Sequence, residues 1–295
     1  METARCKAFL AAAEEGSFTK AADRLSYTPS GISQLVTALE QELGVTLLHR
    51  TQRGVTPTEI GKTLLPSVRK LLQGESCLYE QAAELNGLLI GSITVAAYSS
   101  IATHWLPAVI RNFQHDYPQI EIRLMEGIRQ EVVRWLDERR ADLGFLSYQE
   151  PMHGDWFPLA EDPMLAVLPP EHPLAHERAF PLENCAYDRF IMPALGRDDD
   201  VAALFERRGV VPNIQYTTLE NFAAMAMVEQ GLGVSVMNEL ITKRRECSAV
   251  LLQLDPPASI TLGLALPSQK SAPPAVRKFV EYAIRQLTKT ETTTV

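Results

Sequence analysis

Apolar residues in the N-terminal part of the chain recur three and four residues apart, which is the spacing of one face of an α-helix. The pattern predicts three short helices, with the second over residues 18–25 and the third from residue 28 to residue 43. Ser17 is placed to cap the second helix, and Gly44 is a typical end for the third. An extended segment over residues 45–58 follows. Together these elements predict a small helical domain that ends in a hairpin.

The third helix has two faces of different character. Its apolar residues follow the spacing of a buried stripe, which comprises Ile32, Leu35, Val36, Leu39 and Leu43. Short polar side chains with the same spacing form a second face, which comprises Ser30, Ser33, Gln34 and Thr37. A recognition helix in the DNA major groove needs such hydroxyl and amide groups near its N-terminus. Most polar helix faces are only solvated, so this face needs the surrounding pattern to indicate DNA binding.

A single long helix is predicted from residue 58 to residue 86. Its apolar residues form a heptad-like seam, which comprises Leu64, Val68, Leu71, Leu78, Ala82 and Leu85. Glu75 occupies the skipped position of this seam. The seam favours pairing with a second helix in a dimer, and the alternative is a helix that lies on its own domain. A helix of about 29 residues is about 44 Å long, which exceeds what a small domain needs and favours the dimer.

Strands and helices alternate after the boundary at residues 87–91, and the strands are rich in β-branched residues. This alternation predicts parallel or mixed α/β sheets. A segment of about 205 residues is long enough for two such lobes. The predicted domains are 1–57, 58–90 and 91–295. Within the last of them, the first lobe is predicted at about 91–162 and 267–290 and the second at about 163–266.

The net charge of −8 over 295 residues does not by itself favour binding to DNA, so the position of the basic residues matters. Residues 1–90 hold nine basic and ten acidic residues, so the predicted DNA-binding part is not basic overall. The positive charge gathers in the hairpin and the start of the long helix, at Arg50, Arg53, Lys62, Arg69 and Lys70. Phosphate contacts need basic groups on one face, which this cluster supplies.

Several classes of function lose support from the sequence. Apolar runs stay shorter than the ~20 residues that cross a bilayer, and the N-terminus lacks the pattern of a secretory signal, so we expect a cytoplasmic protein. The four cysteines are far apart and predict neither a disulfide framework nor a zinc site, with a redox pair of Cys185 and Cys247 left open. No nucleophile elbow, metalloprotease, phosphate-loop or dinucleotide motif is present, which argues against an enzyme. A solute-binding protein and a protein–protein adaptor remain as rivals.

The segment SFTKAADRL, followed after three residues by PSGISQLVTALEQELGVTLLHRTQRGVTPTEIG, strongly resembles the helix-turn-helix of LysR-type transcriptional regulators. The resemblance is dense over residues 1–90 and weaker over 91–290. It implies an N-terminal winged helix-turn-helix, a long linker helix and a two-lobed α/β domain like that of periplasmic binding proteins. It also implies a sequence-specific regulator whose operator binding or DNA bending responds to a small-molecule effector. The implied partners are double-stranded DNA, further copies of the chain in a homodimer or homotetramer, and RNA polymerase.

The resemblance and the polar helix face together give the expected DNA-binding residues: Thr28, Pro29, Ser30, Ser33, Gln34, Thr37, Arg50 and Arg53. Arg53 is expected in the wing near the minor groove. Many relatives carry arginine where this chain has Gln34. An amide can pair bidentately with adenine, whereas an arginine favours guanine, so the base preference of relatives cannot be transferred.

The expected effector-binding residues are polar or turn positions that follow strands of the α/β domain: Ser99, Ser100, Thr103, Arg129, Ser147, Tyr148, Pro193, Thr217 and Thr218. Ser99 and Ser100 begin a helix whose free N–H groups favour an anion, and the alternative is that they only cap it. Arg129 suggests an effector with a carboxylate, and the alternative is an exposed ion pair. No cofactor or metal is expected.

Overall fold

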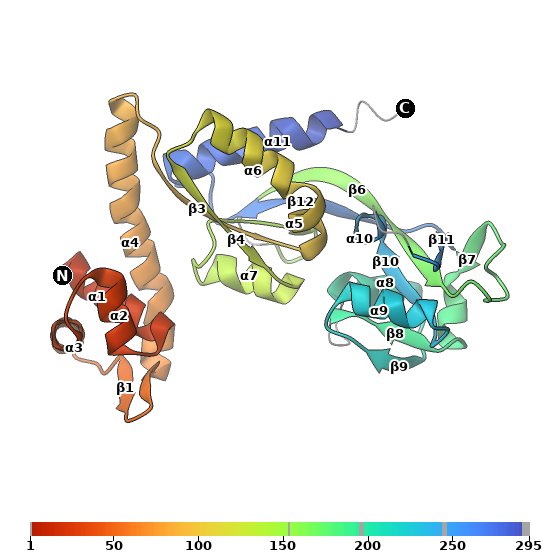
Figure 1. The fold of residues 1–295 in the computed structure, drawn as a ribbon, viewed down its shortest axis with the longest axis horizontal. Helices are drawn as coiled ribbons and strands as arrows, with labels where there is room; N and C mark the ends of the chain where they lie inside the picture. The colour runs from red at the N-terminus through yellow and green to blue at the C-terminus, as the bar shows by residue number, and fades with distance from the viewer. Residues whose placement is uncertain (1, 153, 195–197, 244–246, 291–295) are drawn as a thin grey trace.

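The computed structural model describes residues 2–152, 154–194, 198–243 and 247–290 (Figure 1). Its N-terminal domain consists of α1 (Thr3–Glu15), α2 (Phe18–Leu25), α3 (Pro29–Leu43), β1 (Leu48–Thr51) and β2 (Gly54–Pro57). The predicted limits of α2 and α3 are confirmed. The Ser17 side chain accepts a hydrogen bond from the backbone N–H of Lys20, and Gly44 ends α3 in the left-handed conformation with φ 68°.

The core of this domain is formed by one face of each helix together with the hairpin. Ile32, Val36 and Leu39 are fully buried, as the apolar stripe of α3 predicts. They pack with Phe9 from α1. Leu43, the last predicted member of the stripe, is 42% exposed because it occupies the final residue of the helix.

Helix α4 (Glu59–Leu85) is the predicted linker helix, and its seam divides into two halves. Leu64, Val68 and Leu71 pack against the core of the N-terminal domain. Leu78 and Leu85, in contrast, are 66% and 89% exposed. The first half of the seam therefore lies on its own domain, and the second half is left uncovered within one chain.

The α/β part consists of two lobes that lie side by side beyond α4 (Figure 1). Lobe I contains β3 (Gly91–Ala97), α5 (Ser99–His104), α6 (Leu106–Asp116), β4 (Ile120–Glu126), α7 (Arg129–Asp137), β5 (Leu143–Ser147), β12 (Ser259–Leu266) and α11 (Pro274–Thr290). Lobe II contains β7 (Ala179–Pro181), η1 (Leu182–Ala186), β8 (Phe190–Met192), α8 (Asp199–Arg208), β9 (Ile214–Thr217), α9 (Asn221–Glu229), β10 (Ser235–Asn238), α10 (Glu239–Thr242) and β11 (Val250–Asp255). No helix in the described part of the chain is both long and apolar enough to cross a membrane.

Strand β6 (Asp155–Leu168) belongs to both lobes. From Asp155 to Pro163 it pairs with β12, and from Met164 onward it pairs with β10 and β11. The partner on the other side of β12 is β5 of lobe I. β12 therefore belongs to lobe I and not to the second lobe, where it was predicted, because an alternating apolar pattern predicts a strand but not the strand that pairs with it.

Polar contacts join α4 to lobe I. The Arg69 guanidinium donates to the Glu138 carbonyl at 3.2 Å and to Glu14 of α1 at 3.2 Å. The Gln73 amide donates to Asp142 at 2.7 Å, and the same carboxylate accepts the backbone N–H of Thr94. These bonds connect the N-terminal domain, the linker helix and lobe I.

A buried carboxyl, Glu80, lies in this interface. It is 7% exposed, and its Oε2 atom has no hydrogen-bond partner among the described residues. The pKa of Glu80 is raised from 4.5 to about 7, chiefly by burial and to a smaller extent by the nearby Asp142 charge, against the lowering effect of a hydrogen bond from the Ala275 N–H. Cys77 lies close enough to Glu80 for the Glu80 charge to raise the pKa of its thiol, although burial is the larger cause. The folded state therefore favours the protonated form of Glu80.

We expect Glu80→Gln to stabilise the protein at pH 8 by about 1–2 kcal/mol and to leave it nearly unchanged at pH 5. A carboxyl whose pKa is raised by folding contributes its stability below its unfolded pKa and loses that contribution as the pH rises through the folded value. The window here runs from 4.5 to about 7. Urea unfolding at several pH values measures the effect. Glu84→Gln, at an exposed site of the same helix, is the control, and an equal gain in both variants would contradict the assignment.

Candidate DNA-binding surface and effector cleft

The start of α3 presents most of the predicted DNA-binding residues at the surface. Thr28, Pro29, Ser30 and Gln34 are exposed. The Thr28 hydroxyl accepts the Gly31 N–H at 3.1 Å and lies 3.1 Å from the Ser30 hydroxyl, so it caps the helix. The first turn is thus fixed by its own cap while its polar side chains face outward.

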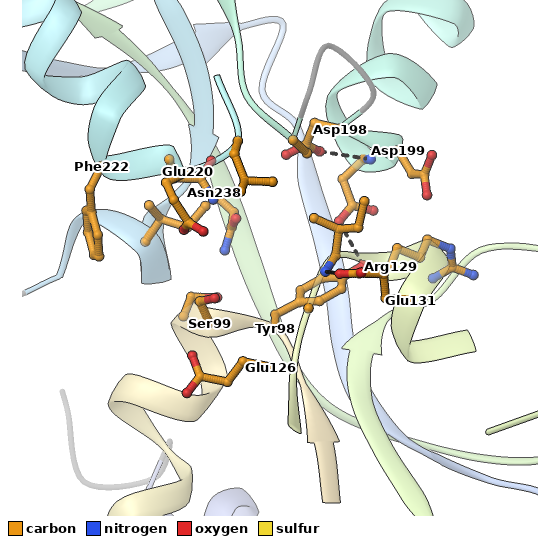
Figure 2. Close-up of a pocket in the computed structure, with 18 of the residues that line it drawn as sticks. Tyr98, Ser99, Glu126, Arg129, Glu131, Asp198, Asp199, Glu220, Phe222 and Asn238 are labelled. Atoms are coloured by element: carbon orange, nitrogen blue, oxygen red, sulfur yellow. Dashed lines mark hydrogen bonds between the residues drawn. The ribbon is translucent and has the colours of Figure 1, made fainter. Parts of the chain in front are cut away.

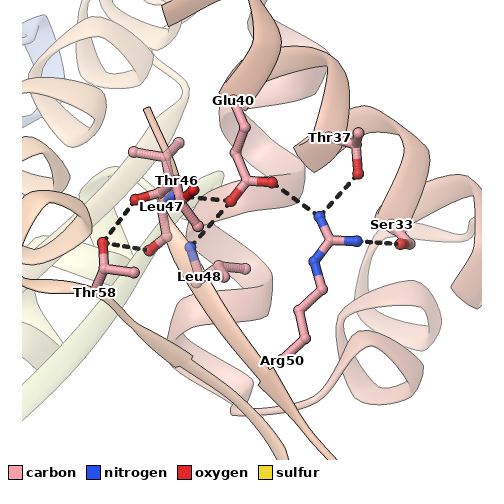
Figure 3. Close-up of polar contacts among 8 residues, drawn as sticks. All are labelled: Ser33, Thr37, Glu40, Thr46, Leu47, Leu48, Arg50 and Thr58. Atoms are coloured by element: carbon pink, nitrogen blue, oxygen red, sulfur yellow. Dashed lines mark hydrogen bonds and ion pairs between the residues drawn. The ribbon is translucent and has the colours of Figure 1, made fainter. Parts of the chain in front are cut away.

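Arg50, on strand β1, ties the hairpin to α3 (Figure 3). Its guanidinium donates to the Ser33 hydroxyl at 3.2 Å and to the Thr37 hydroxyl at 2.8 Å. It also forms an ion pair with Glu40 at 2.9 Å and lies 5.5 Å from the centre of the Phe18 ring. In this arrangement Arg50 holds the predicted base-reading hydroxyls in place. Its direct contact with DNA stays a prediction.

Glu40 is a residue whose role the sequence analysis missed. One carboxylate oxygen accepts the backbone N–H groups of Leu47 and Leu48, at 2.8 and 3.2 Å, and the other binds Arg50 (Figure 3). The position of Glu40 in the helix-turn-helix motif was the sequence signal for this role. Arg53 lies in the exposed turn between β1 and β2, where a wing would extend.

A cavity of about 520 Å³ lies between the two lobes. The lobe I wall comes from the ends of β3 and β4 and the starts of α5 and α7, and the lobe II wall comes from the starts of α8, α9 and α10 (Figure 2). Its described lining is Tyr98, Ser99, Ser100, Thr103, Glu126, Gly127, Ile128, Arg129, Glu131, Ala194, Asp198, Asp199, Asp200, Leu219, Glu220, Asn221, Phe222, Asn238 and Ile241.

Four of the predicted effector-binding residues lie in this lining: Ser99, Ser100, Thr103 and Arg129. The others lie elsewhere, although the assignment as a whole stays a prediction. Ser147 is fully buried behind the lining, and Pro193 is buried next to it. The Tyr148 and Trp156 rings have their centres 5.5 Å apart. Thr217 ends β9 and Thr218 follows it, and both lie outside the described lining.

The guanidinium of Arg129 is hydrogen-bonded to other groups of the protein. It donates to the backbone carbonyls of Ser147 and Gln149, the latter at 3.2 Å. Figure 2 shows its guanidinium turned away from Glu126 and Glu220. A carboxylate in the cavity would have to compete with these carbonyls for the arginine.

Asp200, at the start of α8, lines the cavity and links the two lobes. Its Oδ1 atom accepts hydrogen bonds from the Ser147 hydroxyl and the Gln149 amide, both at 2.6 Å. The Tyr98 hydroxyl lies 2.9 Å from the Ser147 hydroxyl. Burial raises the pKa of Asp200, which its hydrogen bonds to Ser147 and Gln149 oppose. We call Tyr98, Ser147, Gln149 and Asp200 the interlobe latch.

The acidic residues of the cavity were also missed. Asp198 caps α8 through the N–H groups of Asp200 and Val201, and burial, followed by the Asp200 charge, raises its pKa to about 6. The run of three aspartates before a helix was visible in the sequence. The position of these aspartates opposite Glu126 was not visible in the sequence, because only the fold brings the two segments together.

Comparisons with known proteins identify both parts of the chain. Residues 4–62 match the family model described as bacterial regulatory helix-turn-helix protein, lysR family, and residues 86–288 match the LysR substrate binding domain. The chain is 32% identical over 287 residues to the uncharacterized HTH-type transcriptional regulator YvbU of Bacillus subtilis, covering 96% of this chain and 98% of the relative.

Solved structures share the whole architecture. Full-length OxyR of Pseudomonas aeruginosa matches with a TM-score of 0.76 at 20% identity, covering 98% of both chains. HinK of the same species, a LysR family transcriptional regulator, matches with a TM-score of 0.60 at 26% identity, covering 98% of this chain and 99% of that one. The predicted fold class is confirmed. The chain therefore belongs to the LysR family, as a DNA-binding transcriptional regulator with an effector-binding domain and not an enzyme.

Proposed function

We propose that the chain reads a specific operator through the exposed face of α3, and that a small molecule in the cavity between the lobes modulates operator binding or DNA bending. The observation that carries the first part is the capped, outward-facing start of α3, which Arg50 holds against the wing. The cavity and its match to a substrate-binding domain support the second part.

The regulatory step is a change in the angle between the lobes. A ligand can shift this angle only as far as its affinity differs between the two arrangements. The latch at Asp200 is one contact that such a change would alter, because it joins residues of both lobes. The bonds from α4 to lobe I carry the change toward the N-terminal domain.

The proposed assembly is a homodimer or homotetramer. The uncovered half of the α4 seam supports it, since Leu78 and Leu85 are more than half exposed in one chain, as is Tyr79 beside the seam. Large exposed apolar residues along one helix favour burial against a partner. Contact with RNA polymerase at the promoter and a location in the cytoplasm, where the operator DNA lies, follow from the proposed role.

Gln34→Ala is the direct test of operator reading. We expect it to weaken binding to the operator by about 10- to 100-fold, because an amide paired with a base contributes about 1–3 kcal/mol of discrimination. Binding to random DNA should change less than twofold, because phosphate contacts carry it. Ser33→Ala should act in the same direction. Fluorescence anisotropy measures both affinities, with a fragment from upstream of the gene itself as the operator.

Gln41→Ala is the matched control, since Gln41 is an exposed glutamine later on the same helix and outside the predicted reading face. It should leave both affinities unchanged. Equal losses on operator and random DNA for Gln34→Ala would remove Gln34 from the reading face. Binding that does not distinguish the upstream fragment from random DNA would contradict the proposed function itself.

A further inference from the structure

The cavity between the lobes is lined mainly by negative groups. Its described lining contains one guanidinium, that of Arg129, and six carboxyl side chains: Glu126, Glu131, Asp198, Asp199, Asp200 and Glu220. The Arg129 guanidinium is already bound to two backbone carbonyls. The electrostatic potential in the cavity therefore favours positive charge.

Two of these carboxylates are available to a ligand. Glu126 and Glu220 are exposed and come from opposite walls of the cavity, the first from the end of β4 and the second from the residue before α9 (Figure 2). The other four, in contrast, have partners in the protein. Glu131 accepts the Ile128 N–H, Asp198 caps α8, Asp199 accepts the Gln130 amide at 3.2 Å, and Asp200 accepts two hydrogen bonds of the latch. Glu126 and Glu220, whose carboxylates accept no hydrogen bond from the described residues, thus lie where a ligand that spans the cavity would meet both.

An acceptor without a partner lies in the same wall. The side-chain oxygen Oδ1 of Asn221, next to Glu220, is buried and has no hydrogen-bond partner among the described residues. A buried acceptor left unpaired costs about 1–3 kcal/mol. Because this oxygen is shielded from solvent, a donor supplied by a ligand would stabilise it once the Asn221 side chain turns toward the cavity. This oxygen can accept a hydrogen bond only from a donor such as an N–H or O–H group. An ammonium or guanidinium provides such a donor, and a carboxylate does not.

The size of the cavity indicates an organic molecule. About 520 Å³ falls within the range of about 300–1,000 Å³ that is typical of small-molecule sites. The walls combine carboxylates with the apolar side chains of Leu219, Phe222 and Ile241. An aliphatic amine has a matching character, with charged ends and an apolar stem.

We propose that the effector of this regulator is an organic cation, an aliphatic di- or polyamine or a basic amino acid, whose ammonium or guanidinium groups bind Glu126 and Glu220. This inference rests on the proposed effector role of the cavity. It changes the expected class of effector from a carboxylate to an organic cation.

The test is a binding series with the full chain. The probes are α,ω-diamines of three to five carbons, L-lysine and L-arginine, with butanedioate and 1,4-butanediol as anionic and neutral counterparts of matched length and MgCl₂ as an inorganic cation. We expect at least one cationic organic probe to raise the unfolding temperature and to bind at sub-millimolar concentration by calorimetry. The anionic and neutral counterparts should bind at least tenfold more weakly.

The double variant Glu126→Gln/Glu220→Gln should weaken binding of that probe at least tenfold. Glu171→Gln/Glu177→Gln removes the same charge from exposed sites outside the cavity and should leave binding unchanged. No binding by any cationic organic probe up to 10 mM, equal stabilisation by MgCl₂, preference for butanedioate, or equal losses in the two double variants would each overturn the proposal. Operator binding measured on the same samples separates this failure from that of the proposed function, since specific DNA binding would persist.

Discussion

Gly61→Ala is expected to destabilise the N-terminal domain by about 2–3 kcal/mol and to abolish operator binding. Gly61 lies in the first turn of α4, where the helix passes close to the hairpin. A Cβ atom at this position would stand 2.2 Å from the carbonyl oxygen of Leu47, which is a backbone atom and cannot rotate away. The same carbonyl accepts the Thr58 N–H at 2.9 Å, so relieving the overlap would separate the start of α4 from the hairpin.

The same helix offers a control of the same chemistry. Gly74 is exposed, and a Cβ there would meet no atom within 4 Å. Gly74→Ala should therefore stabilise the protein by about 0.5–1 kcal/mol, because alanine loses less backbone entropy than glycine in a helix. Urea unfolding and operator anisotropy measure both variants. Similar effects of the two substitutions would show that the contact of Gly61 with Leu47 is unimportant.

Asp200→Ala is expected to open the interlobe latch. It removes the acceptor of the half-buried Gln149 amide and leaves the buried Ser147 hydroxyl with only the Tyr98 hydroxyl as a neighbour that could accept its hydrogen. A buried donor left without an acceptor costs about 1–3 kcal/mol. The expected result is a destabilised effector domain, with hydrogen exchange near residues 147–149 and α8 faster by at least tenfold. Operator binding in the absence of effector should remain, because the N-terminal domain does not contact the latch.

Two neighbouring substitutions sharpen this experiment. Asp200→Asn keeps an oxygen that can accept both hydrogen bonds, and it should retain most of the protection because burial already disfavours the charge of Asp200. Asp199→Ala removes one hydrogen bond, from Gln130 at 3.2 Å, that lies at an exposed site. Asp199→Ala should therefore change the hydrogen-exchange rates only slightly. Equal exchange rates in the Asp200→Ala and Asp199→Ala variants would remove Asp200 from the latch.

The N-terminal domain could be predicted well because its signals are local. A cap such as Ser17 or a left-handed glycine such as Gly44 acts within one turn of chain, and the apolar stripe of α3 needs only the period of the helix. The seam of α4 could be predicted as apolar, but the sequence does not say which surface covers it. Leu64 and Leu78 belong to the same pattern, yet only Leu64 is covered by its own domain.

The cavity was harder to predict for a physical reason. Its walls combine segments that are far apart in the sequence, such as Glu126 and Glu220, and their charges matter only because the fold places them around one space. Arg129 was predicted at the cavity, but its role changed with its partners. A guanidinium already bound to two carbonyls is a weaker anion site than the same side chain without them.

The course of β6 has a mechanical consequence. The strand changes partners at Pro163, where pairing with β12 gives way to pairing with β10 and β11. Proline has no N–H to donate, so bending the strand at this residue breaks no hydrogen bond that its own nitrogen would make. Each lobe keeps its own ladder intact on either side. We therefore expect that the angle between the lobes can change at this residue without either lobe having to refold.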